Sequence, residues 1–157
     1  MRQIPDPGFA GDDGTADPRL TEVLSGYDAD PDFDFRRVLA VFQHARVLVP
    51  VIARPGGKTS DMATVLTRGS DGRLGMFAFT STAAMTAWNA AARPVPVTVR
   101  QAAEAALAED AQALLVDLRG PVFFVVGEQD LRALAAGQQL LRTGDSYGWY
   151  KPVRAQR

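Results

Sequence analysis

Two stretches of apolar residues with helical spacing open the folded part of the chain. The first follows Asp17-Pro18, in which a good N-cap residue precedes a proline suited to the first helical position. Its apolar side chains recur at positions i, i+3, i+4 and i+7 and are Leu20, Val23, Leu24 and Tyr27. The second follows Asp30-Pro31 and repeats this spacing between Phe35 and Phe42. The sequence therefore predicts two amphipathic helices that start at these two Asp-Pro pairs.

Short segments rich in β-branched and apolar residues indicate strands in the rest of the chain. These segments are 47–53, 62–68, 74–79, 94–99, 113–118 and 122–126. Turn residues at 69–72 and 119–121 join two pairs of them into hairpins. Proline cannot donate to a strand ladder, so we expect Pro50 at an edge or a bulge, and the segment that contains Pro94 and Pro96 at an edge.

Three further helices are expected between and after these strands. One is capped by Thr80 or Ser81, one covers the alanine-rich residues 101–110, and one covers 128–136 and ends at Gly137. The predicted order of elements is ααβββα(β)αββα. Because hairpins interrupt the helices, this order predicts an α+β fold, with a mixed, largely antiparallel sheet of five or six strands covered by helices.

The chain has 157 residues, which is the length of one domain, and its composition divides it into three parts. Residues 1–17 are rich in Gly, Pro and acidic residues and are predicted to form a mobile leader. Residues 18–141 form the predicted domain, and 142–157 form a tail. Residues 1–34 carry a net charge of −7 and the remainder +6. The leader therefore either lies across a basic body, its own or a neighbouring protomer's, or extends into solvent.

Cysteine is absent from the chain, and histidine occurs once, at His44. The composition excludes a disulfide framework, a thiol nucleophile and cysteine-bound zinc or iron–sulfur clusters, and we expect neither a metal nor a cofactor. No apolar run reaches the roughly 18–20 residues that span a bilayer. The first residues also lack the basic-then-apolar order of a signal peptide. We therefore expect a cytoplasmic protein without a membrane partner.

A glycine-rich loop after the first strand supplies the candidate binding residues. Its Gly57-Lys58-Thr59 resembles the end of a phosphate-binding loop, but Ile52 stands where that motif needs a glycine, and a strand follows where it needs a helix. We therefore expect no nucleotide hydrolysis. The first hairpin could instead bring the loop and the start of the next helix together around a small ligand or an anion. The binding residues of such a site would be Lys58, Ser60, Asp61 and Thr80.

Catalysis at these hydroxyl groups would need a base to activate one of them. Lys58 could serve only if it were desolvated, so we assign no catalytic residue and keep an enzyme of unknown reaction as the weaker alternative. Two other interpretations stay open. The hydroxyl groups could simply cap their own loop and the helix that follows, or the N-terminus of that helix could bind an anion.

Aromatic and basic residues interleave in the tail, as is typical of nucleic-acid or peptide contacts. They are Tyr147, Trp149, Tyr150, Lys151 and Arg154. The sequence pI of 5.8 and the short length of the tail argue against nucleic acid. We expect these side chains to dock on the domain or to contact a partner, which would be an unknown protein or a second copy of the chain.

Five segments carry a family resemblance by their serial order. They are Lys-Thr-Ser-Asp-Met-Ala at 58–63, Phe-Ala-Phe-Thr-Ser at 77–81, Ala-Trp-Asn at 87–89, Ala-Arg-Pro-Val-Pro-Val at 92–97 and Gly-Pro-Val-Phe-Phe-Val-Val at 120–126. Together with Phe-Ala-Gly-Asp-Asp-Gly at 9–14, they resemble the N-terminal domain of the SseB family, in its actinobacterial branch. The resemblance covers residues 9–137 and implies no particular activity, cofactor or catalytic residue.

The sequence as a whole favours a non-enzymatic binding or protein-interaction module, which self-associates or binds a partner through a strand edge or the tail. This interpretation rests on the lack of a convincing acid–base pair, nucleophile system or metal set. A small-ligand or anion-binding domain that uses the Lys58–Asp61 loop is the alternative.

Overall fold

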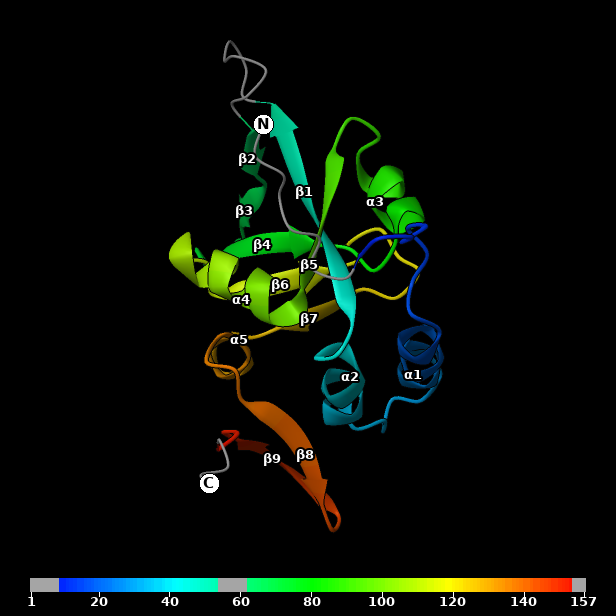
Figure 1. The fold of residues 1–157 in the computed structure, drawn as a ribbon, viewed down its shortest axis with the longest axis vertical. Coiled ribbons are helices and arrows are strands. Elements are labelled where there is room, and N and C mark those ends of the chain that lie inside the picture. The colour runs from blue at the N-terminus through cyan, green and yellow to red at the C-terminus, as the bar shows by residue number, and fades with distance from the viewer. Residues whose placement is uncertain (1–8, 54–61, 154–157) are drawn as a thin grey trace.

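The computed structural model describes residues 9–53 and 62–153 (Figure 1). Within these ranges the chain forms five helices and nine strands. The helices are α1 (Pro18–Ala29), α2 (Phe35–Phe42), α3 (Thr82–Trp88), α4 (Val99–Ala108) and α5 (Glu128–Ala135). The strands are β1 (Arg46–Ala53), β2 (Met62–Thr64), β3 (Leu66–Arg68), β4 (Leu74–Ala78), β5 (Arg93–Thr98), β6 (Ala113–Val116), β7 (Phe124–Val126), β8 (Gln139–Thr143) and β9 (Ser146–Tyr150).

The predicted α+β class is confirmed, but the strands do not form one sheet. They form three sheets, of order β2-β1-β5, β3-β4-β6-β7 and β8-β9, in which β4 and β6 are the only parallel pair among the described strands. The prediction of one sheet of five or six strands is wrong because the expected strand at 62–68 is divided. Its first half pairs with β1 and its second half with β4, with Val65 between them. The two larger sheets meet at a bridge between Leu48 and Phe79.

The prolines of the first sheet lie at positions where the β1–β5 ladder needs no N–H donor. β5 is an edge strand, as its prolines predicted, with Pro96 opposite Leu48 and Pro94 opposite Pro50. The N–H and C=O groups of Leu48 both bond to Phe79, at 2.8 and 2.9 Å, on the side of β1 that faces away from β5. These proline pairs are therefore the non-hydrogen-bonded pairs of the β1–β5 ladder. Pro50 was expected at an edge or a bulge, but it lies in the central strand β1, just before pairing with β2 begins.

The helix caps agree with the sequence pattern in part. Asp17 caps α1 as predicted, because its side chain accepts a hydrogen bond from the amide of Arg19. Helix α2 starts later than predicted, since Asp34 rather than Asp30 is its N-cap. Ser81 caps α3, so that the Thr80 side chain is available for a different contact.

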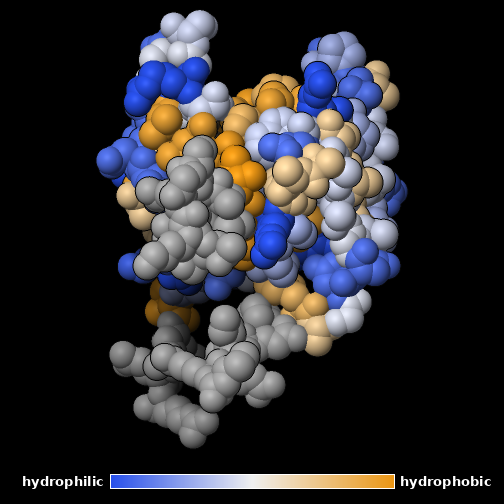
Figure 2. All heavy atoms as spheres, turned by 90° about the horizontal axis from the view of Figure 1, so that it is seen from above, coloured by the Kyte–Doolittle hydropathy of each residue, from blue (hydrophilic) through white to orange (hydrophobic). Residues whose placement is uncertain are grey.

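The four-stranded sheet has a packed core on each face. Met76 and Ala78 of β4 point into the main core, to which α1, α2, α4 and α5 contribute, whereas Phe77 and Phe79 point into a smaller core with α3 and β1. Helices α1 and α2 lie below this sheet, and the end of β1 rises above it (Figure 1). Seen from above, hydrophobic residues gather in the middle of the upper face, between hydrophilic ones at its borders (Figure 2).

The expected tail begins inside a β-hairpin, because β8 crosses residue 141, where the predicted domain ends. A two-residue loop, Gly144-Asp145, joins β8 to β9, and Gly144 has a φ of +64°. This left-handed conformation favours glycine and suits a tight hairpin. The hairpin lies at the lower end of the molecule, beyond α5 (Figure 1). Its Leu140 and Trp149 side chains pack against the main core.

Candidate functional site

The structure places one of the four predicted ligand-binding residues. Lys58, Ser60 and Asp61 lie outside the described residues, as does the loop at 57–59 that resembles a phosphate-binding motif. A site formed by the Lys58–Asp61 loop therefore stays a prediction. Thr80 is buried, directly after β4 and directly before the cap of α3.

Thr80 contacts a buried carboxylate that the sequence analysis did not single out. Its amide donates to Asp117 Oδ1 at 2.8 Å, and its hydroxyl donates to Asp117 Oδ2 at 2.6 Å. The Asp117 residue has 0% of its surface exposed. Burial raises the pKa of Asp117 above its ordinary value, and the two hydrogen bonds from Thr80 oppose this effect. Carboxyl groups perturbed by burial occur preferentially at functional sites.

The backbone brings these two residues together at the ends of neighbouring strands. β4 and β6 are parallel, so Thr80 and Asp117, which follow them, lie at the same end of these two strands. The amide of Asp117 donates to the carbonyl of Ala78 at 3.0 Å, which continues the ladder by one bond. Asp117 itself has a φ of +56°, a left-handed conformation that aspartate adopts more readily than most residues. Parallel pairing and this turn thus direct the carboxylate toward Thr80.

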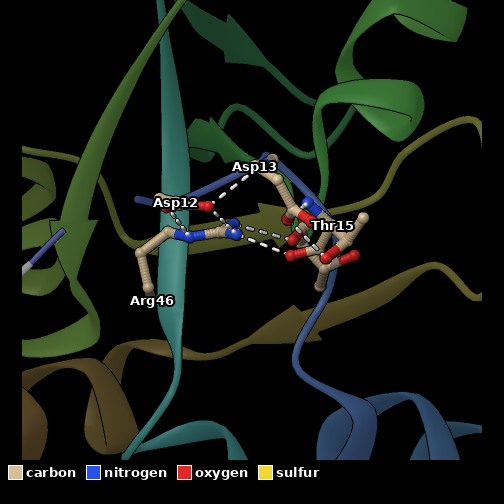
Figure 3. A network of polar contacts seen from close by, with 6 residues as sticks. Asp12, Asp13, Thr15 and Arg46 are labelled. Carbon is tan, nitrogen blue, oxygen red and sulfur yellow. Dashed lines mark hydrogen bonds and ion pairs between the residues drawn. The ribbon is translucent and has the colours of Figure 1, made fainter. Parts of the chain in front are cut away.

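Arg46, the first residue of β1, joins Thr80 to the acidic leader. Figure 3 shows how Arg46 lies beside Asp12 and Thr15. Its Nη1 donates to the Thr80 carbonyl at 2.9 Å, while Nε and Nη2 reach the two carboxylate oxygens of Asp12 at 2.7 and 2.9 Å. Nη2 also donates to the Thr15 carbonyl at 2.6 Å. The side chains of Arg46 and Asp12 are only 13% and 19% exposed. Solvent therefore screens this ion pair less than an ordinary surface pair.

The described leader residues make a tight turn around Gly14. Asp13 accepts hydrogen bonds from the hydroxyl and amide of Thr15, at 2.7 and 3.0 Å, and these bonds lower the pKa of Asp13. Gly14 has a φ of +82°, and its carbonyl accepts from the amide of Thr82 at 2.8 Å. Two amides in the first turn of α3 thus donate to protein acceptors, Thr82 to the Gly14 carbonyl and Ala84 to the Ser81 hydroxyl. Anion binding at this helix end stays a prediction. Residues 9–16 contact the domain, and the mobility of the leader stays a prediction.

A second candidate surface surrounds β7, one of the two edge strands of the four-stranded sheet. Phe123 and Val125 are 44% and 40% exposed although both are large and apolar. Val125 lines two open hollows, one of about 290 Å³ at the strand edge and one of about 220 Å³ on the upper sheet face. Tyr27 and Phe35 complete the edge hollow. β7 therefore borders both hollows with Val125, and the edge hollow also with the neighbouring Phe123.

The peptide groups of Val125 face the open edge. Because Asp117 N–H bonds to β4, the odd-numbered residues of β6 direct their N–H and C=O groups toward β4. The even-numbered Leu114 and Val116 therefore form the hydrogen-bonded pairs with β7, opposite Val126 and Phe124. Val125, between those two residues, directs its own N–H and C=O away from β6. Edge groups of this kind are a template for pairing with another strand.

Acidic residues occupy the segment that connects Tyr27 to Phe35, two residues that line the edge hollow. Asp28, Asp30, Asp32 and Asp34 are all exposed in the segment that connects Tyr27 to Phe35. The Nε atom of Arg36 lies 3.6 Å from Oδ1 of Asp34. Among the described residues, no cation lies within ion-pair distance of the other three. The segment between Tyr27 and Phe35 therefore carries four negative charges and no positive one.

The predicted interaction tail is divided between the core and the surface. Tyr147 and Trp149 are half-buried against the main core, and the indole N–H of Trp149 donates to Asp130 at 3.1 Å. Tyr150 and Lys151 are exposed, and Arg154 lies outside the described residues. The proposed contact of this tail with a partner thus rests on Tyr150 and Lys151 and stays a prediction.

The remaining polar candidates add no metal centre. His44, the single histidine, is exposed two residues after the end of α2. Within residues 9–53 and 62–153, no three His, Cys, Asp or Glu side chains are grouped so as to hold a metal ion. Across the same ranges, no helix combines the length and apolarity needed to cross a bilayer.

Comparison with known proteins places the chain in a family but gives no curated relative. No curated protein is similar enough to the chain to count as a match. The sequence model of the SseB protein N-terminal domain matches residues 20–133, from the first turn of α1 to the last turn of α5. This match covers well over half of the 157 residues and contains Thr80, Asp117 and β7. The chain therefore belongs to the SseB family.

Proposed function

We propose that this chain is a non-enzymatic protein-interaction module that binds an extended segment of a partner protein along the edge of β7. The observation that carries the proposal is Val125, whose N–H and C=O face the open edge and whose side chain is 40% exposed between two hollows. We propose that it acts in the cytoplasm. We also propose that it belongs to the actinobacterial branch of the SseB family, on the motifs at 9–14 and 58–126.

The surface defines the chemistry of the partner segment. A strand that pairs with Val125 gains main-chain hydrogen bonds, and its alternate side chains point to one face. Those side chains should be apolar, because the hollows on either side of β7 contain Leu115, Phe123 and Tyr27. Lysine or arginine at the ends of the segment would suit the exposed acidic residues at Asp28–Asp34, which lie between Tyr27 and Phe35 in the sequence. The proposed partner is therefore an extended apolar segment with basic flanks.

A synthetic peptide can test this surface directly. The probe is a peptide of alternating valine and threonine with two lysines at each end, and its control carries proline in the centre. Titration into ¹⁵N-labelled protein should shift the amide resonances of Phe123 and Val125, and the proline-containing control should shift them far less. Shifts that avoid β7, or that the two peptides produce equally, would overturn the proposal.

One pair of variants separates the edge from the rest of the sheet. Val125→Pro removes an N–H that the β6 ladder does not use, so the sheet should persist while the peptide loses its central hydrogen bond. Val125→Thr keeps the N–H and a β-branched side chain, and it should retain binding. Undiminished binding by Val125→Pro would exclude strand pairing at this edge.

A second copy of the chain is the other occupant that the experiment detects. Two β7 edges could pair with each other, which sedimentation velocity would record as a concentration-dependent dimer. A dimer that Val125→Pro abolishes, without any peptide binding, would keep the edge as an interface but overturn the partner proposed here.

A further inference from the structure

A polar hollow of about 180 Å³ lies where the end of α2, the start of α4 and the segment from α5 to β8 meet. At about 30 Å³ per water molecule, it has room for roughly six waters or a small ion. Four residues with polar side chains in its wall are His44, Arg100, Gln138 and Gln139. His44, Arg100 and Gln139 are exposed, so a ligand can reach the hollow from solvent.

Two long-range contacts of the fold bring these segments together. In the β1–β5 ladder, Arg46 lies opposite Thr98, so His44 before β1 and Arg100 after β5 lie at the same end of that ladder. The side chain of Gln43 bonds to both backbone groups of a β8 residue, which holds the start of β8 against the end of α2. The hollow is therefore formed by segments that are distant in the sequence but fixed relative to one another.

The guanidinium group of Arg100 lies over the backbone of Gly137 in this wall. A Cβ at Gly137 would be 2.7 Å from Nη1, 2.9 Å from Cζ and 3.2 Å from Nη2 of Arg100. Only glycine leaves room for this close approach. Within residues 9–53 and 62–153, the Arg100 side chain makes no ion pair and no hydrogen bond. Its N–H donors are therefore available to a ligand.

The end of α5 does not use these donors either. A helix C-terminus attracts cations, so the dipole of α5 favours the position of Arg100. The carbonyls of Arg132, Ala133 and Leu134, however, each accept a hydrogen bond from a backbone amide of residues 136–138. The helix thus contributes to holding the cation in place while its own carbonyls are satisfied by the backbone.

The polar groups of the wall restrict the chemistry of a ligand. No carboxylate lines the hollow, and a cation would be repelled by Arg100. The side chains of His44, Gln138 and Gln139 make no hydrogen bond in the described part of the chain, and each can donate one. The guanidinium of Arg100 alone can occupy both oxygens of a carboxylate, whereas a phosphate has further oxygens for the other donors. A phosphate group therefore fits this set of donors best.

We infer that this hollow binds a phosphate group, either as inorganic phosphate or as a small phosphate monoester. Two phosphate oxygens would accept from the Arg100 guanidinium, and the others would face His44 and the carboxamides of Gln138 and Gln139. The inference is independent of the proposed peptide surface, because no residue that lines this hollow lines the hollows at β7. It also lies apart from the anion sites considered from sequence, since neither the Lys58–Asp61 loop nor the start of α3 lines it.

Sodium phosphate and methyl phosphate are the probes for this site. Each is titrated into tag-free, ¹⁵N-labelled protein at fixed pH and constant ionic strength, with sodium chloride as the control. His44 is the single histidine of the chain, so its ring Hε1 resonance reports without ambiguity, together with the Gly137 amide. Inorganic phosphate should shift both resonances and saturate, and chloride should not. Equal responses to phosphate and chloride would overturn the inference. Saturation by methyl phosphate as well would show that the site accepts a monoester, and saturation by inorganic phosphate alone would restrict it to the free ion.

Two arginine variants form a matched pair. Arg100→Gln removes the cation of the hollow and should weaken phosphate binding by about tenfold or more, because hydrogen bonds to charged groups are the strong ones. Arg93→Gln removes the same charge at an exposed position of β5 that does not line the hollow, and it should leave binding unchanged. Both positions are exposed, so both variants should fold. Equal binding by the two variants would mean that phosphate follows the net charge only, and would overturn the site.

A second pair tests the position of the guanidinium. Gly137→Ala would place a Cβ against the Arg100 guanidinium and push it away, and it should weaken phosphate binding. Gly72→Ala carries a similar backbone strain, since φ is +83° at Gly72 and +78° at Gly137, but its Cβ meets open space. This control should bind phosphate like the wild type. Equal binding by the two alanine variants would overturn the placement of the ligand beside Gly137. If Gly137→Ala does not fold, the arginine pair still decides the outcome.

Discussion

Thr80 donates both its amide and its hydroxyl to the carboxylate of Asp117, which lies 37 residues further along the chain. The contact joins the ends of the parallel strands β4 and β6. Arg46 adds a third element, because it donates to the Thr80 carbonyl while it holds Asp12 of the leader. One buried carboxylate thus links two strands of the second sheet to the first residue of the first sheet. The consequences of this arrangement can be measured one group at a time.

Thr80→Val should destabilise the fold, because it removes one of the two donors to a buried carboxylate and leaves the shape nearly unchanged. We expect the free energy of unfolding to fall by about 1–3 kcal/mol, the usual cost of an unsatisfied buried group. Urea denaturation measures this difference. Thr80→Ser, which keeps the hydroxyl, should lose clearly less. If the two variants lost the same amount, methyl packing rather than the hydrogen bond would explain the effect.

The raised pKa of Asp117 predicts a specific pH dependence of stability. The folded state binds a proton at Asp117 more tightly than the unfolded state, whose value is near 3.8. The contribution of Asp117 is therefore most favourable below pH 3.8 and declines as the pH rises through the folded-state pKa. Asp117→Asn lacks this titration, so the stability of the wild type relative to the variant should decrease across that window and level off above it.

Parallel urea titrations of the two proteins at several pH values provide this measurement. Most other carboxyl groups cancel in the difference, including Asp13, whose lowered pKa has the opposite effect on stability. A difference that increases with pH would contradict the prediction, because it would mean that the ionised carboxylate is stabilised in the fold.

Gly14 should be the position at which the leader is most sensitive to substitution. A Cβ at Gly14 would overlap the hydroxyl of Thr82, whereas a Cβ at Gly11 would meet open space. Both glycines have a φ of +82°, so the strain of alanine in a left-handed conformation is the same at both. We therefore expect Gly14→Ala, but not Gly11→Ala, to speed hydrogen exchange at the Thr82 amide, which donates to Gly14. Equal exchange in the two variants would mean that the leader is not held by this contact.

Local sequence signals predicted the elements whose structure depends on neighbouring residues. The Asp17-Pro18 start, the turn at 69–72 and the hairpin across 119–121 follow from cap and turn chemistry, and each is present. The division of residues 62–68 was not predictable in this way. It depends on which strand each half meets, β1 or β4, and those partners are distant in sequence.

The candidate site was predicted less well, for two physical reasons. Thr80 was singled out as a hydroxyl near a helix start, but its partner Asp117 lay within the predicted strand at 113–118 and carried no signal of its own. Only the parallel pairing of β4 with β6 brings them together and buries the carboxylate. The β8–β9 hairpin did have a local signal, Gly144-Asp145 between two strand-like segments, which the sequence analysis did not use. Val125 could be predicted as a strand residue but not as an edge residue, since the edge depends on the sheet order.

Gln43 should hold the terminal hairpin to α2, because its side chain substitutes for a strand partner. Its Nε2 donates to the Leu140 carbonyl at 2.9 Å, and its Oε1 accepts from the Leu140 amide at 2.8 Å. Gln43→Leu keeps a similar volume and removes both bonds, so hydrogen exchange at the Leu140 amide should become faster. Gln43→Glu keeps the acceptor but places a carboxylate beside the carbonyl, so the Leu140 amide should exchange at an intermediate rate. Trp149 fluorescence, recorded in a Trp88→Phe background, should shift to longer wavelength in the same order as the hairpin loosens. Unchanged exchange at Leu140 in Gln43→Leu would show that packing of Leu140 and Trp149 on the main core is sufficient to hold the hairpin.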